Sequence, residues 1–287
     1  MVQPDALSPT TPTLVRERVR HELTARHLTV VRAADITPSL RRVTLTGDLS
    51  GFASGGAGDH VKAFFPDPAT GELHAPRMTA QGLERPEGVT MISRDYTPRA
   101  WRDDELDLDF VLHDDGGPAV AWAASARPGD PLVVAGPRGS RLAPAGVDWW
   151  LLGGDETALP AIARWLEDLP AGVPVHVLVE VSGPDDETYL ADVAGAGLDG
   201  RHVTWLHRRG AAPGTTALLA DAVRALEVPA GVGFTWFGGE SGSLRAVRRH
   251  LRHGLGLATE QVDVSGYWKC GTANHDHHAP VDPDDPA

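Results

Sequence analysis

The chain has 287 residues, of which 39 are acidic and 26 are basic, so its formal charge is −13 at pH 7. At about 150 residues per domain this length predicts two domains, and hydrophobic and charged contents of 41% and 23% are typical of a soluble globular protein. Such an acidic chain is a poor general binder of nucleic acids and anionic membranes, and a single cysteine, Cys270, excludes intrachain disulfides and cysteine-based zinc or iron–sulfur sites.

Two further absences bear on location. No apolar run approaches the ~20 residues of a membrane-spanning helix, and the first residues lack the basic and apolar regions of a signal peptide. We therefore expect a cytoplasmic protein, in a reducing compartment, without nucleic acid or membrane partners. We also expect a monomer, but no feature of the sequence determines the oligomeric state.

The first domain is predicted over residues 26–140. It follows an N-terminal extension, residues 1–25, whose first 13 residues are rich in Pro, Ser and Thr and expected to be disordered. At Leu106–Leu112 large apolar residues alternate with Asp107, Asp109 and Val111, which predicts a strand with one face in the core and one in solvent. Other strands are predicted around Val43–Leu45 and at His60–Phe65, Val89–Arg94 and Pro131–Ala135. Because Gly- and Pro-rich turns separate these strands, we expect an antiparallel β-barrel.

The second domain is predicted over residues 141–271, with a boundary near residues 138–148. Strands are expected at Trp149–Gly153, Val173–Val181, His202–Leu206 and Gly233–Phe237, and helices at Glu156–Leu169, Thr215–Leu226 and Ser241–Arg252. This alternation is typical of a doubly wound parallel sheet. Residues 272–287 form a polar tail rich in His, Asp and Pro, which we expect to be disordered from Ala279 onward.

Two segments of the second domain have the pattern of nucleotide-binding turns. Each runs from a predicted strand through a glycine pair, Gly153-Gly154 or Gly238-Gly239, into a predicted helix. Helix starts at the carboxyl edge of a parallel sheet present free amides to a nucleotide, but an ordinary turn has the same spacing, so both interpretations stay open. Gly195–Gly200 matches the fingerprint GxGxxG, yet a strand is predicted after it instead of a helix, so we interpret it as a surface loop.

Two segments of the first domain combine groups that suit a nucleotide with a flat ring. Ser93–Arg99 brings together Arg94, Tyr96, Thr97 and Arg99, which offer donors for phosphate, a planar face and a hydroxyl. A charged strand end is the alternative interpretation of that segment. Residues 111–122 then predict a strand, a Gly-Gly-Pro turn and a short helix whose N-terminus suits a pyrophosphate.

The segment Arg94-x-Tyr96-Thr97-x-Arg99 resembles the flavin-binding motif of ferredoxin reductase-like enzymes. Further segments resemble, more specifically, the siderophore-interacting protein family of FAD-dependent ferric-siderophore reductases. They are Asp59-His-Val-Lys62-x-Phe-Phe-Pro, Phe110-Val-Leu-His113-x-Asp-Gly-Gly-Pro-Ala, Gly136-Pro-Arg-Gly-Ser, Gly154-Asp-Glu-Thr-Ala-Leu-Pro-Ala and Gly266-Tyr-Trp-Lys269-x-Gly. Each motif is short, but the ordered set, which runs from Arg26 to Gly271, is specific.

The resemblance implies an FAD-binding barrel followed by an NAD(P)H-binding α/β domain, in agreement with the periodicity. It implies that Arg94, Tyr96 and Thr97 contact the flavin and its phosphates, with Arg99 in the same segment. Further contacts to the flavin and its pyrophosphate are implied for His113, Gly117, Pro118, Ala119 and Trp122. The region where nicotinamide approaches the flavin is implied to be lined by Asp155, Glu156 and Thr157.

The only two lysines, Lys62 and Lys269, fall within matching motifs, one in each domain. In the family, basic side chains near the flavin attract the anionic ferric siderophore, so the resemblance implies that both lysines bind substrate. Hard anionic oxygens hold Fe(III) in siderophores, and a local positive patch suits such a ligand. From composition alone, two solvated surface lysines are the alternative. The family often has another basic residue after this segment, where this chain has Thr272.

Other polar residues leave questions open. His275, His277 and His278 lie close together in the tail, and we interpret them as solvated side chains without a metal. We assign Cys270 no catalytic role. Arg208 and Arg209 follow a predicted strand where the 2′-phosphate of NADPH is bound in such folds, but solvated arginines are the alternative, so NADH and NADPH both remain candidates.

The sequence thus predicts an NAD(P)H-dependent ferric-siderophore reductase that contains FAD. A hydride passes from nicotinamide to the flavin, and single electrons pass on to Fe(III), so no residue of this chain is expected to act as a catalytic acid, base or nucleophile. A reductase whose acceptor is a protein explains the motifs equally well. A flavin-free siderophore carrier is a third hypothesis, and the intact Arg94–Arg99 segment argues against it.

Overall fold

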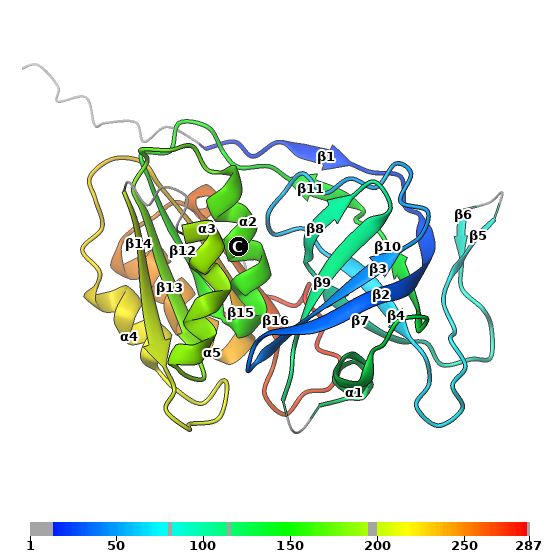
Figure 1. The fold of residues 1–287 in the computed structure, drawn as a ribbon. Helices are drawn as coiled ribbons and strands as arrows, with labels where there is room; N and C mark the ends of the chain where they lie inside the picture. The colour runs from blue at the N-terminus through cyan, green and yellow to red at the C-terminus, as the bar shows by residue number, and fades with distance from the viewer. Residues whose placement is uncertain (1–13, 80–81, 114–115, 195–199, 286–287) are drawn as a thin grey trace, which may run out of the picture.

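The computed structural model describes residues 14–79, 82–113, 116–194 and 200–285. Two regions lie side by side, a β-sheet region and an α/β region (Figure 1). The extension predicted to be disordered, residues 1–13, and most of the GxGxxG loop, residues 195–199, lie outside the described residues. None of the described helices is long and apolar enough to cross a membrane.

The first region contains a seven-stranded antiparallel sheet in the order β7-β4-β10-β2-β3-β9-β8. Its strands are β2 (Ala25–Thr37), β3 (Leu40–Thr46), β4 (Val61–Phe65), β7 (Ile92–Tyr96), β8 (Pro98–Arg102), β9 (Glu105–Val111) and β10 (Pro131–Ala135). Because Thr97 alone connects the two edge strands β7 and β8, the sheet must curl until these edges approach each other. The curled sheet confirms the antiparallel fold that the period-two pattern predicted.

Smaller elements complete this region. They are β1 (Arg18–Arg20), β5 (Arg77–Thr79), β6 (Gly82–Glu84), β11 (Gly139–Arg141) and helix α1 (Pro118–Ser125). Strand β1 pairs with β11, and β5 pairs with β6. Helix α1 packs below the curled sheet in Figure 1, with Ala119 and Ala123 in the same buried cluster as Phe65 and Phe110.

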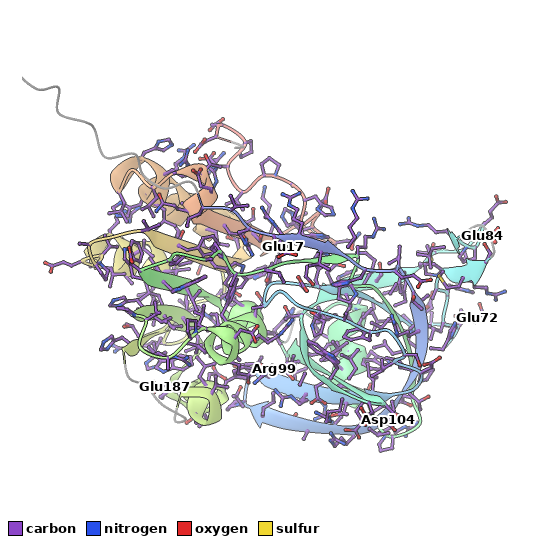
Figure 2. The ribbon with its side chains drawn as sticks, turned by 90° about the horizontal axis from the view of Figure 1, so that it is seen from above. Glu17, Glu72, Glu84, Arg99, Asp104 and Glu187 are labelled. Atoms are coloured by element: carbon purple, nitrogen blue, oxygen red, sulfur yellow. The ribbon has the colours of Figure 1, made fainter. Side chains whose placement is uncertain are left out.

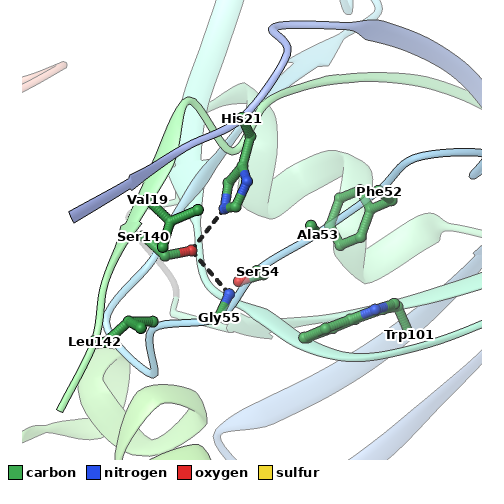
Figure 3. A pocket seen from close by; sticks show the side chains of 9 residues that line it. All are labelled: Val19, His21, Phe52, Ala53, Ser54, Gly55, Trp101, Ser140 and Leu142. Carbon is green, nitrogen blue, oxygen red and sulfur yellow. Dashed lines mark hydrogen bonds between the residues drawn. The ribbon is translucent and has the colours of Figure 1, made fainter. Parts of the chain in front are cut away.

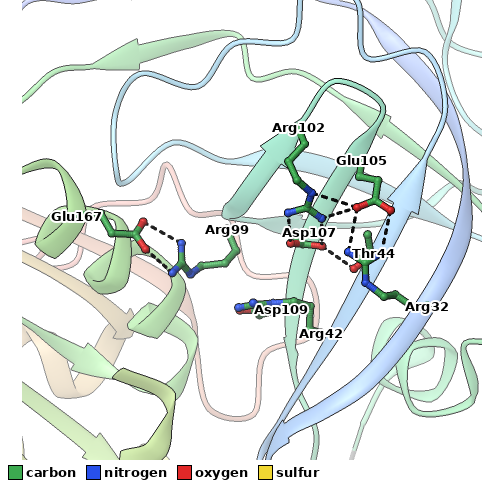
Figure 4. A network of polar contacts seen from close by, with 9 residues as sticks. All are labelled: Arg32, Arg42, Thr44, Arg99, Arg102, Glu105, Asp107, Asp109 and Glu167. Carbon is green, nitrogen blue, oxygen red and sulfur yellow. Dashed lines mark hydrogen bonds and ion pairs between the residues drawn. The ribbon is translucent and has the colours of Figure 1, made fainter. Parts of the chain in front are cut away.

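The prediction that one face of β9 meets solvent is wrong. Asp107 and Asp109 are only 4% and 5% exposed. Asp107 accepts hydrogen bonds from Thr44 (2.5 Å) and Arg102 (3.0 Å), and Asp109 accepts two from Arg42 (2.7 and 2.8 Å), as Figure 4 shows. A buried carboxylate is tolerated when it is paired and hydrogen-bonded, so the alternating pattern identified the strand and its two faces but not what covers the polar one.

The second region is a five-stranded parallel sheet in the order β14-β13-β12-β15-β16. Its strands are β12 (Trp149–Asp155), β13 (Val175–Val181), β14 (Arg201–His207), β15 (Gly233–Glu240) and β16 (Val262–Trp268); its other elements are η1 (Glu156–Ala158), α2 (Leu159–Asp168), η2 (Pro184–Leu190), α3 (Ala191–Ala194), α4 (Leu218–Ala225), α5 (Ser241–Arg249), η3 (His250–Gly254) and η4 (Thr259–Gln261). Trp150 packs with α2, whereas Trp149 packs with α4 and α5. Helices therefore cover both faces, which confirms the doubly wound sheet; β16 is a strand that the pattern did not predict.

The two regions share a packed interface. Leu40 and Ala57 of the first region belong to the same buried cluster as Ile162 of α2. Thr37 donates a hydrogen bond to Asp186 at 2.7 Å across the interface. These contacts fix the position of the β-sheet region relative to the α/β region.

The predicted disorder of the tail from Ala279 onward is wrong as far as Asp285. Val281 and Asp282 are buried. Asp282 accepts a hydrogen bond from Arg245 (3.0 Å) and pairs with Arg249, and the Arg249 guanidinium lowers the pKa of Asp282 to about 2. Pairing of tail carboxylates with the arginines of α5 and burial of a valine explain why this polar segment is ordered.

Candidate active site

Arg94 and the N-terminus of α1 converge in the first region. A guanidinium nitrogen, Nη2, of Arg94 lies 3.8 Å from the position that a Cβ of Gly117 would occupy. Gly117 is the N-cap of α1, Pro118 follows it, and among the described residues no side chain caps the helix. A helix N-terminus facing an arginine is a suitable arrangement for a phosphate or pyrophosphate. His113 is exposed, and its carbonyl accepts a hydrogen bond from the Gly116 amide at 3.1 Å.

An aromatic cluster lies beside Arg94. The ring of Tyr96 is 4.4 Å from that of Phe110, and Trp122 of α1 lies 5.4 Å from Phe65, each measured between ring centroids. Tyr96 is half-buried, and its burial raises the pKa of its hydroxyl above the ordinary value. Trp122 packs against Phe65 of β4 and Phe110 of β9 and thereby fixes α1 against the sheet that holds Arg94.

The last two residues of the Arg94–Arg99 motif face the second region. Thr97 is buried and hydrogen-bonds the hydroxyl of Tyr267 on β16. Arg99 forms a two-pronged ion pair with Glu167 of α2, at 2.6 and 2.9 Å, and lies at the junction of the two regions (Figure 2). The structure therefore brings Arg94, Tyr96, Gly117, Pro118 and Ala119 together but directs Arg99 to the interface.

Asp155 ties three strands of the parallel sheet together at their carboxyl edge. Its carboxylate accepts hydrogen bonds from the amides of Thr157 and Glu240, both at 2.9 Å, and from the Trp268 indole at 2.8 Å. Burial raises the pKa of Asp155. These partners satisfy the hydrogen-bonding capacity of the carboxylate, so the role of Asp155 is to hold the carboxyl edge of the sheet in shape.

Glu156 forms a buried ion pair with Arg208. Both side chains are buried, one of their hydrogen bonds measures 2.9 Å, and Glu180 lies 3.8 Å from the same guanidinium. Burial raises the pKa of Glu156. Because Arg208 already faces two carboxylates, it is not available for a 2′-phosphate; Arg209 is exposed, with a φ of 51°.

The glycine pair before Asp155 has a packing role. Gly154 has a φ of +155°, and a Cβ there would lie 1.9 Å from the carbonyl oxygen of Gly238 on the neighbouring strand. Only glycine allows this approach of β12 to β15. The glycine pairs of the two predicted turns therefore meet each other in the sheet, and this packing is compatible with both interpretations of the turns.

The two lysines differ in their surroundings. Lys62 on β4 is partly exposed and pairs with Asp95 on β7 at 2.7 Å. Lys269 is exposed at the end of β16, and its carbonyl accepts a hydrogen bond from Thr272 at 3.0 Å. Cys270 is exposed.

The segment after β16 reaches back to the first region. Asn274 accepts a hydrogen bond from Arg94 at 3.2 Å, and His277 Nδ1 lies 3.0 Å from an Asp95 oxygen. The interpretation of the three tail histidines as solvated is therefore wrong for His277, whose side chain is 20% exposed. Asp95 and His277 are far apart in the sequence, so no local pattern predicts their pairing.

Profiles of known families match the chain in the order that the fold shows. Residues 29–141 match the siderophore-interacting FAD-binding domain, and residues 147–271 match the siderophore-interacting protein profile. The NADPH-dependent ferric-chelate reductase of Escherichia coli strain K12 is 38% identical over 259 residues, which cover 88% of this chain and 96% of that protein. The chain belongs to the siderophore-interacting protein family.

Other members of the siderophore-interacting protein family support this assignment. The ferric vibriobactin reductase ViuB of Vibrio cholerae is 34% identical over 260 residues, covering 88% of this chain and 92% of that one. A siderophore utilization protein from T. fusca has a crystal structure that matches with a TM-score of 0.85 and 42% identity, covering 92% of this chain and all of that one. Solved structures below 25% identity, ferredoxin reductases among them, share the ferredoxin reductase-like fold and show the fold alone.

The residues around Arg94 fit the FAD that this family binds. The uncapped start of α1 and the Arg94 guanidinium suit the pyrophosphate, and the half-buried ring of Tyr96 offers a planar surface next to them. Sequence reasoning missed Asp95, Asn274 and Tyr267. Asp95 and Tyr267 lie within the sequence motifs, but only the structure shows what these three residues contact.

A separate hollow lies elsewhere in the first region. It has a volume of about 290 Å³ and an apolar lining, and Figure 3 shows its residues. They are Val19, His21, Phe52, Ala53, Ser54, Gly55, Trp101, Ser140 and Leu142. None of the predicted site residues lines it, so it is not part of the candidate site.

Proposed function

We propose that the protein is an NADPH-dependent ferric-siderophore reductase that works through bound FAD. The observation that supports this most directly is the convergence of Arg94, Tyr96 and the α1 N-terminus in a chain that matches ferric-chelate and ferric vibriobactin reductases over nearly their whole length. The flavin supplies the redox chemistry, between a two-electron nicotinamide donor and a one-electron Fe(III) acceptor.

The residues of the first region bind and orient this cofactor. Arg94 and the amides at the start of α1 hold the pyrophosphate, Tyr96 and Thr97 contact the flavin, and Trp122 holds α1 in place. His113, just beyond the end of β9, contacts the cofactor from the solvent side. We leave Arg99 out of this set, because its guanidinium is taken by Glu167.

The residues of the second region form the rim at which nicotinamide approaches. Asp155, Glu156 and Thr157 lie at the carboxyl edge of the sheet and are held by one another, by Trp268 and by Arg208. Their role is to keep the shape of this edge. Exposed Arg209 is the candidate for the 2′-phosphate of NADPH.

Substrate binding rests on Lys62 and Lys269. Both are exposed enough to meet an anionic chelate, and a local positive patch acts within the roughly 8–10 Å over which salt screens charges, in spite of the overall charge of −13. Reduction to Fe(II) weakens the hold of hard oxygen donors, so the iron is released.

The division of the chain and its setting are further proposals. The flavin and nicotinamide domains meet within residues 138–148, and the profile matches that end at residue 141 and begin at residue 147 support this boundary. The protein acts as a cytoplasmic monomer, in keeping with its single, exposed cysteine. Cell fractionation and light scattering of the purified protein test these two points.

A turnover assay tests the proposed function. Purified protein is supplied with FAD, NADPH and a ferric siderophore, with an external chelator that traps Fe(II) as a coloured complex. We expect formation of Fe(II) that requires FAD and is faster with NADPH than with NADH. No Fe(II) above the rate without protein contradicts the proposal, and the same NADPH oxidation with a protein acceptor but not with ferric chelate favours the alternative acceptor.

A further inference from the structure

Two histidines and one aspartate gather beside Lys62. The candidate metal-ligand atoms of His60, Asp95 and His277 all lie within 4.8 Å of one another. His277 Nδ1 is 3.0 Å from Asp95 Oδ2, and the ring centroids of His60 and His277 are 4.5 Å apart. Two ligands at right angles around a metal, each bonded at about 2.1 Å, are about 3 Å apart, so small side-chain movements let all three share one ion.

The three side chains come from three separate parts of the chain. His60 precedes β4, Asp95 lies on the neighbouring strand β7, and His277 belongs to the segment after β16. The cluster therefore forms only when that segment lies against the first region, where Asn274 also contacts Arg94. Its position places it next to the proposed flavin and substrate residues and not on a remote surface.

The cluster contains an unsatisfied nitrogen. His277 Nε2 is buried and has no hydrogen-bond partner among the described residues. Buried polar atoms are nearly always paired with protein, water or an ion. An ordered water beside the site, or an ion that Nε2 binds once the ring has turned, would provide that partner.

We propose that His60, Asp95 and His277 form a transient site for a divalent transition-metal ion, and that the ion is Fe(II) released by reduction. The identity of the ion rests on the proposed function. Two imidazoles and one carboxylate with open coordination positions suit Fe(II), whereas the hard anionic oxygens of a siderophore favour Fe(III). His60 is exposed, so the ion enters and leaves from solvent.

Lys62 couples this site to the binding of substrate. Its ammonium lies 2.7 Å from Asp95 and competes with a metal ion for the same carboxylate. When Lys62 turns to an anionic chelate, Asp95 is freed to bind the product ion. Removal of the Lys62 ammonium therefore tightens metal binding.

Metal binding to the untagged, FAD-loaded protein tests the proposal. Equilibrium dialysis against Co(II), a stable substitute for Fe(II), measures ions bound per chain without nucleotide or chelate, and anaerobic dialysis against Fe(II) repeats the measurement with the expected cargo. We expect one ion per chain, weakened at least about tenfold by His60→Ala and by His277→Ala, and tightened by Lys62→Ala. Asp95→Asn, which keeps the size of the side chain, is expected to weaken binding in the same way.

His253→Ala is the control for a surface histidine. His253 is exposed, lies in η3 of the α/β region, pairs with Asp285 and is not one of the three residues of the cluster, so this variant keeps the affinity of the unaltered protein. Flavin content and the unfolding midpoint of each variant show that the fold is retained.

The outcomes separate this proposal from the proposed function. No bound Co(II) or Fe(II), or binding that His60→Ala and His277→Ala leave unchanged, overturns the site even when the turnover assay forms Fe(II). Cluster-dependent Co(II) binding in a protein that reduces no ferric chelate supports the site and overturns the proposed function, and with it Fe(II) as the cargo.

Discussion

The two sequence motifs that predicted cofactor contacts differ in how far their polar side chains are already paired within the protein. In the β-sheet region, Arg94 and the start of α1 face the same space, with no side chain among the described residues capping the helix. In the α/β region, Asp155 and Glu156 are buried and bonded to Thr157, Trp268 and Arg208. The comparison shows that a charged residue near the end of a strand is a candidate ligand contact when the fold leaves some of its polar atoms available. Arg94 Nη1 donates to Ser93 and Asn274, whereas Nη2 points at the start of α1.

The largest effect is expected for Glu156→Gln in the α/β region. This change leaves the buried Arg208 with Glu180, at 3.8 Å, as its remaining ion-pair partner, and loss of one partner of a buried ion pair costs about 3 kcal/mol. Denaturant unfolding should show this loss in the free energy of unfolding. An unfolding free energy within about 0.5 kcal/mol of the original protein would contradict the structural role of Glu156.

The second effect separates the two arginines of one motif. Arg94→Ala removes charge-assisted hydrogen bonds to the pyrophosphate and should weaken FAD binding by roughly 10- to 100-fold. Arg99→Ala removes only the ion pair with Glu167, so FAD affinity should stay within about threefold. Fluorescence titration with FAD measures both. Equal losses of FAD affinity in the two variants would contradict the assignment of Arg94 to the cofactor and of Arg99 to the interface between the regions.

The third effect concerns the lysines. Lys62→Ala and Lys269→Ala should each raise the KM for the ferric chelate by about two- to fivefold, since exposed charge pairs are worth about 0.2–1 kcal/mol. Anaerobic stopped-flow reduction of the flavin by NADPH should not change, because neither side chain is proposed to contact nicotinamide. Unchanged KM values in both variants reject their role in substrate binding.

The smallest effect is the pH dependence of the tail. The pKa of Asp282 is about 2, below its ordinary value of 3.8, so the ion pairs with Arg249 and Arg245 stabilise the folded state fully above about pH 4. This contribution is lost as the pH falls through 2. The difference in unfolding midpoint between the original protein and Asp282→Asn should therefore shrink between pH 4 and pH 2, and a constant difference would contradict the pairing.

The sequence predicted the fold because its local patterns are strong. Alternation in β9 and the apolar runs of β12 and β13 place strands correctly, and the glycine pairs mark where β12 and β15 approach each other. Strand β16 was missed because its pattern, Val-Asp-Val-Ser-Gly-Tyr-Trp, is mixed and it lies at the edge of the sheet.

The candidate site was only partly predictable. Arg94, Tyr96 and the turn at Gly117 form local motifs, and the structure brings them together. The pairings that decide availability join residues far apart in sequence, such as Arg99 with Glu167 and Asp95 with His277. No periodicity or spacing signals such contacts, because they follow from the packing of the two regions.

We propose that electrons pass through FAD held at Arg94 to a ferric siderophore. The most direct test is the visible spectrum of the purified, FAD-loaded protein under anaerobic conditions, first with NADPH and then with the ferric siderophore. We expect the flavin absorption to bleach with NADPH and to return when the ferric siderophore is added. A flavin band that NADPH does not bleach, or one that stays bleached after the ferric siderophore is added, would contradict this proposal.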